Sequence, residues 1–129
     1  QDLCQPLHTT VHHDGRARRD GSSPRSGIHR QLDSLLRTIS PPPMGDSSQG
    51  FSDLFDAVIA ELSSSHAQVD RVYELEGDLR ALHRGASASP ALREFGRQRY
   101  TRAARFTSEL LHTAWLLSAN IELPEWAEP

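Results

Sequence analysis

The residues closest to a metal-binding pattern lie near the amino terminus. Four potential ligands follow the spacing C-x3-H-x3-H-H: Cys4, His8, His12 and His13. On a helix, residues four apart share a face, so Cys4, His8 and His12 would project to the same side. Thiolate and imidazole are ligands that zinc accepts. The segment is polar and contains Pro6, however, so little would order it. We therefore interpret it as a histidine-containing tail and predict no metal ion and no other cofactor.

Catalytic patterns are weak. His66 precedes Asp70 by four residues and His112 follows Glu109 by three, which is enough to orient an imidazole on a helix. The chain has no lysine for Schiff-base or phosphate chemistry, and it has no glycine-rich phosphate loop or nucleophile elbow. A core of two helices also leaves little volume for a substrate pocket. We predict that the protein is not an enzyme.

Charge is divided along the chain, which has 129 residues, a formal net charge of −3 and 14 arginines. Residues 53–78 carry seven acids against Arg71: Asp53, Asp56, Glu61, Asp70, Glu74, Glu76 and Asp78. Residues 80–105 carry seven arginines against Glu94: Arg80, Arg84, Arg93, Arg97, Arg99, Arg102 and Arg105. We interpret the two segments as helices that complement each other across a hairpin. Such surface pairs mainly set register and orientation.

The alternative interpretation of the arginines is nucleic-acid binding. At about 100° per residue, four of them spread over the side opposite the apolar stripe: Arg93, Arg97, Arg102 and Arg105. The planar guanidinium suits bidentate phosphate contacts, and paired helical hairpins could lie along double-stranded RNA. The negative net charge and the absence of lysine argue against this alternative.

Residues 1–50 hold 11 apolar residues and no aromatic residue. Such a segment cannot offset its ordering entropy by burial, so we predict an arm that is largely disordered. One short amphipathic helix is expected at 27–39, because five apolar residues form a single helical stripe before the prolines at 41–43: Ile28, Leu32, Leu35, Leu36 and Ile39. A helix this short is marginal alone and must dock on its own core or on a partner.

Within that helix, Leu32, Leu35 and Leu36 match the pattern L-x-x-L-L. Helices with this pattern can place three leucines in a hydrophobic groove, although simple amphipathicity also accounts for so short a match. We predict these leucines as a docking element for a protein partner.

Residues 51–120 are predicted to form the folded core. Apolar residues recur at a 4-3 spacing, the period of a coiled-coil seam, from Phe51 to a stop at Gly85. Ser63–Ser65 is a weak point, and Ser65 with Gln68 forms a capping-box pattern, so this stretch is either one rod or two pieces. Ser89 and Pro90 start a second helix that ends near residue 120.

Two helices of similar length with a short loop predict an all-α antiparallel hairpin, followed by a tail at 121–129. The hairpin leaves one part of the second helix uncovered, because Trp115 falls on the far side of that helix from Phe95 and Phe106. We therefore predict Phe95, Phe106, Trp115 and Leu116 as partner-binding residues. A docked helix from residues 27–39, a second copy of the chain or another protein would cover them.

These features predict a non-catalytic interaction, adaptor or regulatory module with a protein partner and a possible homodimer. The alternative is a dimeric RNA-binding protein. Cys4 is the single cysteine, so no disulfide forms within the chain, and an intracellular reducing compartment is favoured. No apolar run approaches the ~20 residues that span a bilayer.

Overall fold

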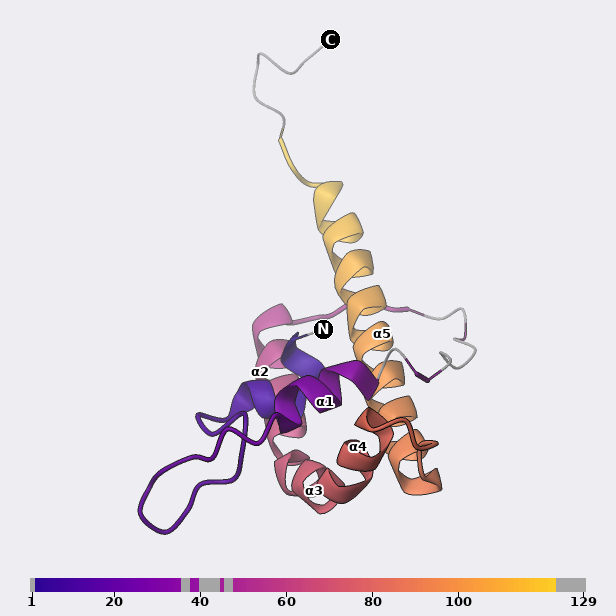
Figure 1. Cartoon of the computed structure of the whole chain (residues 1–129). Coiled ribbons are helices and arrows are strands. Elements are labelled where there is room, and N and C mark those ends of the chain that lie inside the picture. The colour runs from indigo at the N-terminus through magenta and orange to yellow at the C-terminus, as the bar shows by residue number, and fades with distance from the viewer. Residues whose placement is uncertain (1, 36–37, 40–44, 46–47, 123–129) are drawn as a thin grey trace.

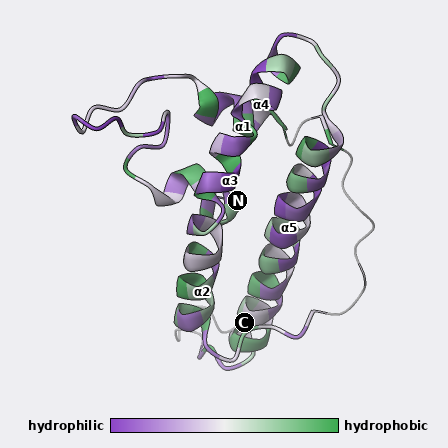
Figure 2. Cartoon of the chain, turned by 90° about the horizontal axis from the view of Figure 1, so that it is seen from below, coloured by the Kyte–Doolittle hydropathy of each residue, from purple (hydrophilic) through white to green (hydrophobic). Residues whose placement is uncertain are grey.

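A computed structural model of the chain describes residues 2–35, 38–39, 45 and 48–122 (Figure 1). In chain order the elements are the 3₁₀ turns η1 (Asp2–Cys4) and η2 (Pro6–Thr9) and the helices α1 (Ile28–Leu35), α2 (Leu54–His66), α3 (Val69–Glu74), α4 (Glu76–His83) and α5 (Pro90–Ser118). The described part of the chain contains no strand, so the predicted all-α class is confirmed. In Figure 2, α5 lies beside the run formed by α2, α3 and α4.

The amino-terminal segment belongs to the core. Leu7 in η2 and Ile28 in α1 are fully buried, and Leu35 is nearly so. They form one apolar cluster with side chains of α3, α4 and α5 and the residue between α3 and α4: Val72, Leu75, Leu79, Leu92 and Phe95. The predicted disorder of the arm is therefore wrong for residues 2–9, while residues 28–35 form the greater part of the helix that was predicted within it. These segments are ordered because they cover apolar side chains that α3, α4 and α5 would otherwise expose.

The loop between η2 and α1 is fastened to α3. The Tyr73 hydroxyl donates to the carbonyl of His12 at 2.8 Å, and Arg16 pairs with Asp70 at 2.6 Å while lying over the Tyr73 ring. Gly27 adopts a φ of +77° directly before α1, a conformation that favours glycine. The contacts with Asp70 and Tyr73 fix the first part of the loop between η2 and α1 against α3.

The helix predicted at 27–39 is shorter in the structure. It begins at Ile28 and is described as far as Leu35, while Leu36 and Arg37 lie outside the described residues. Thr38 is in a turn, with its backbone N–H donating to the Leu35 carbonyl at 3.0 Å. The helix packs against α4, so it docks on the core of its own chain.

The first half of the predicted hairpin is divided into three helices, and the break differs from the predicted one. Helix α2 continues through the serines to His66, and Gln68 precedes α3. Ser65 is fully buried, and its hydroxyl donates to the carbonyl of Leu3 at 2.6 Å. Ser65 therefore does not cap α3; its small polar side chain lets η1 approach α2.

Helix α5 starts where the sequence predicts. The Ser89 hydroxyl accepts from the backbone N–H of Leu92 at 3.1 Å, and Pro90 occupies the first helical position. The helix has 29 residues, and its carboxyl-terminal end extends beyond the other helices (Figure 1). Among the described helices, none is both long enough and apolar enough to cross a bilayer.

Candidate functional site

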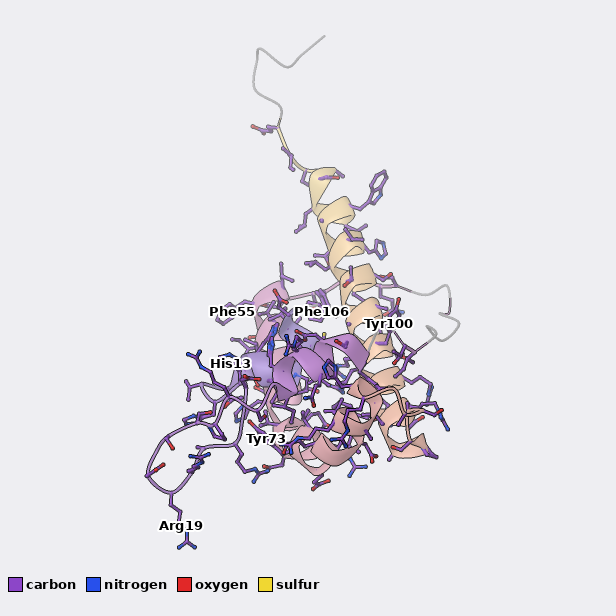
Figure 3. All side chains as sticks on the ribbon, viewed as in Figure 1. His13, Arg19, Phe55, Tyr73, Tyr100 and Phe106 are labelled. Carbon is purple, nitrogen blue, oxygen red and sulfur yellow. The ribbon has the colours of Figure 1, made fainter. Side chains whose placement is uncertain are left out.

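The extended end of α5 carries the largest group of exposed apolar side chains on any one element. We call this surface the α5 tip and define it by five residues of α5 and one residue just after the helix: Leu110, Leu111, Trp115, Leu116, Leu117 and Ile121, of which Trp115 is 77% exposed. At about 100° per residue, Leu110 and Leu117 share one side of the helix, and Leu111 and Trp115 share another. The side chains at this end of α5 stand clear of the other elements in Figure 3.

One side of the α5 tip is anchored to the segment before α2. The backbone N–H of Phe51 donates to Thr113 Oγ1 at 2.7 Å, and the Phe51 ring lies 4.9 Å from that of Phe106. Gly50 has a φ of +73°, and a Cβ there would lie 3.2 Å from Thr113 Oγ1. The glycine therefore permits the close approach that covers the Thr113 side of α5. The side chains of Leu111, Trp115 and Leu117 remain exposed.

The predicted partner-binding residues fall into two groups. Leu32, Leu35 and Phe95 are buried in the core and leave no exposed surface for a partner. Leu36 lies outside the described residues. Phe106 is half-buried against Phe51, whereas Trp115 and Leu116 are exposed on the α5 tip. Because α1 packs on α4 and Trp115 stays exposed, α1 is not the cover for Trp115, and of the three predicted covers a second copy and another protein are left.

The four arginines of the RNA alternative are each engaged within the chain. Arg97 forms a two-pronged contact with Glu94, which lowers the pKa of that carboxyl and raises the pKa of Arg97. Arg105 pairs with Glu109 at 3.0 Å. Arg93 donates to the carbonyl of Ala88. The fourth contact joins Arg102 of α5 to Glu61 of α2 at 2.6 Å.

This pattern differs from the predicted pairing between an acidic and a basic helix. Among the described residues, the Arg102–Glu61 bridge connects α5 to α2, while the other bridges of α5 and α4 lie within single helices. Pairs of residues three or four apart on a helix compete with pairs across the core because they require no tertiary approach. The arginines of α4 and α5 therefore pair mainly with acids of the same helix, and Arg102 alone among these bridges pairs with an acid of α2.

A cavity of about 370 Å³ lies between the amino-terminal segment, α1 and α5, where the sequence predicted little pocket volume. Its lining residues include Cys4, His8, Asp33, Phe95 and Arg99. Burial lowers the pKa of Arg99, whose buried Nε and Nη1 have no hydrogen-bond partner among the described residues. Arg99 interrupts the apolar stripe of the second predicted helix, and that interruption is the sequence signal for this site.

The Cys4 thiol on this cavity is held in its protonated form. Burial raises its pKa to about 11, and the nearby Glu61 carboxylate adds to the effect by its charge and a hydrogen bond. Since the thiolate is the nucleophilic form, Cys4 is not an activated nucleophile in this structure.

The raised pKa of Cys4 predicts a loss of stability at alkaline pH. The thiol takes up its proton more tightly in the folded chain than at its usual pKa of 9.0, so its stabilising effect is complete below pH 9 and is lost as pH rises through about 11. Urea unfolding at pH 8 and at pH 10.5 should show this fall, and Cys4→Ala should reduce it. The chain has no lysine to titrate in this range, although Tyr73, whose pKa burial also raises, titrates in both proteins. An equal fall in wild type and Cys4→Ala would contradict the prediction.

The histidines near the amino terminus do not gather as the sequence pattern suggested. Within the described residues, Cys4, His8 and His12 form no group of ligand atoms. His8 instead lies with His29 and Asp33, whose side-chain ligand atoms all fall within 4.8 Å of one another. Sequence spacing gave no sign of this group, because His8 and His29 are brought together only when α1 docks.

Comparisons of the chain with protein-family profiles, with curated protein sequences and with solved structures find no significant match.

Proposed function

We propose that the protein is a non-catalytic interaction module, with an adaptor or regulatory role, that binds protein through the α5 tip. The observation that carries this proposal is the row of exposed large apolar side chains on a helix end that projects from the core. Contiguous exposed apolar surface of this kind is typical of protein–protein contact sites. Trp115 is the natural anchor, because buried tryptophans dominate the energetics of many interfaces.

The occupant that fits the α5 tip best is the same surface of a second copy. A two-fold pairing would bring identical exposed apolar surfaces together. Between residues 108 and 121 the titratable side chains are Glu109 and His112, and Glu109 is paired with Arg105. Two copies can therefore approach at this end without strong charge repulsion, and we propose a homodimer whose bundle is completed by both α5 helices.

RNA binding is the second candidate, and the structure supports it less. Three of its four arginines have carboxylate partners, so binding a phosphate backbone there would require breaking pairs such as Arg97–Glu94 or sharing them. The corresponding helix surface is consequently closer to neutral than the sequence suggests. The experiments on the α5 tip must therefore distinguish RNA binding from dimerisation.

Trp115→Ala is expected to weaken self-association by about 2 kcal/mol or more, roughly 30-fold in the dissociation constant. Sedimentation velocity over a range of protein concentrations measures the monomer–dimer equilibrium. Val11→Ala is the matched control, because Val11 is 88% exposed but belongs to the loop between η2 and α1, and it should leave the equilibrium unchanged.

Salt and RNA separate the two candidates. Association through apolar side chains should change little between low and moderate salt, whereas RNA binding should weaken steeply and lose part of that slope in an Arg93→Ala/Arg97→Ala variant. A chain that stays monomeric at every concentration and shifts only with a short RNA duplex would overturn the proposed function in favour of the second candidate.

A further inference from the structure

Three potential metal ligands meet between η2 and α1, at the edge of the cavity described above. His29 and Asp33 are one helical turn apart on α1, with His29 Nδ1 3.4 Å from Asp33 Oδ2. The His8 imidazole of η2 stacks on that of His29, with ring centres 4.9 Å apart and an angle of 18° between the planes. One ligand atom from each of the three residues lies within 4.8 Å of the others.

We propose that His8, His29 and Asp33 bind a zinc ion. Imidazole and carboxylate are common zinc ligands, and bonds of 2.0–2.1 Å in a tetrahedron place neighbouring ligand atoms roughly 3.3 Å apart. The separation of His29 Nδ1 from Asp33 Oδ2 already matches that edge. Two imidazoles on one tetrahedral zinc have ring centres roughly 5 Å apart, which is close to the separation of His8 and His29. Side-chain rotation of His8, which lies at the surface, completes the site.

Neighbouring side chains orient these three ligands. Gln5 Nε2 donates to Asp33 Oδ1 at 3.1 Å, which leaves Oδ2 directed at His29. Asp2 Oδ1 lies 3.4 Å from His8 Nδ1, so this carboxylate can hold the ring while Nε2 faces the metal. Carboxylate and amide partners of this kind fix the orientation of metal ligands in known zinc sites.

The proposed ion would have three ligands from the protein and one position open to solvent. His8 and Asp33 line the cavity, so a water molecule or a small ligand in the cavity can take the fourth position. The ion would also tie η2 to α1, two segments that are separated by the long loop at 10–27. Zinc is therefore expected to stabilise the packing of the amino-terminal segment, and this role is independent of the α5 tip.

The test uses the full chain without a histidine tag. Titration with zinc should show one tight site per chain and a rise in Tm that increases with zinc concentration, because the ion binds the folded chain. Cobalt in place of zinc should give the intense visible absorption of a tetrahedral site. Magnesium should give no effect, since it requires octahedral oxygen ligands.

Variants distinguish this site from the other histidines. His29→Ala and Asp33→Asn should each weaken zinc binding by at least about tenfold, with helical circular dichroism showing that the variants remain folded. The matched control is His13→Ala, because the His13 ring packs edgewise on His29 at 5.4 Å without belonging to the ligand group. It should leave the affinity unchanged.

Two results would overturn the proposal. One is the absence of any stoichiometric zinc effect on Tm or of the tetrahedral cobalt spectrum in the wild-type chain. The other is a folded Asp33→Asn variant that binds zinc as tightly as the wild type, which would assign binding to dispersed histidines.

Discussion

Leu7→Ala is expected to lower the free energy of unfolding by about 2–5 kcal/mol, the range for a fully buried leucine. The Leu7 side chain has no exposed surface and belongs to the same apolar cluster as Leu32 and Phe95. Truncation removes its packing and leaves a cavity that the surrounding helices fill only in part. Since small domains are stable by about 5–15 kcal/mol, the loss is a substantial share of the total.

Urea unfolding measures this effect, and Val11→Ala is its control. Val11 lies four residues further along the chain, yet it is 88% exposed and its truncation should change stability by no more than about 0.5 kcal/mol. If Leu7→Ala were as mild as Val11→Ala, the amino-terminal segment would not be part of the core. A large effect of Leu7→Ala with an unchanged m-value shows that the folded state includes η2.

The amino-terminal contribution could not be predicted from the sequence because its signals are not periodic. Helix α1 has a stripe of apolar residues and was expected, and the start of α5 is marked by Ser89 and Pro90. Residues 2–9 offer only isolated apolar side chains such as Leu7, in short 3₁₀ turns with no helical repeat. Whether such a side chain is buried depends on the surface it meets, and that surface is formed by elements far along the chain.

The sequence predicted one part of the α5 tip and missed what surrounds it. The helical repeat placed Trp115 off the main stripe, and the structure shows this residue exposed. The repeat could not show that α1 covers the other end of the molecule, which buries Phe95 and leaves the α5 tip open. Nor could it show the pairing of Arg97 with Glu94, because local and cross-helix partners lay equally within reach of each arginine.

Phe95→Ala is expected to lower the free energy of unfolding by about 3–5 kcal/mol. Phe95 is 4% exposed and packs in the core cluster, where it also lines the cavity beside Arg99. Phe95→Leu keeps most of the apolar volume and should cost less than about 1.5 kcal/mol if the neighbouring side chains repack. Urea unfolding at protein concentrations low enough to keep the chain monomeric measures both values.

Trp115→Ala supplies the matched comparison on the same helix. Trp115 is 77% exposed, so its truncation should change the stability of the monomer by no more than about 0.5 kcal/mol. The substitution should instead raise the dissociation constant of the proposed dimer. Phe95→Leu should show the reverse pattern, with reduced stability and normal association of the folded protein.

Variants of Phe95 and Trp115 therefore distinguish a residue that packs in the core from a residue that binds a second copy, both on the same helix. Phe95 lies on the main apolar stripe of the helix and Trp115 lies off it, and in the structure Phe95 is buried in the core while Trp115 is exposed. If Trp115→Ala destabilised the monomer as strongly as Phe95→Ala, the end of α5 would be packed against the chain itself. The α5 tip would then not be a surface that is free to bind a second copy.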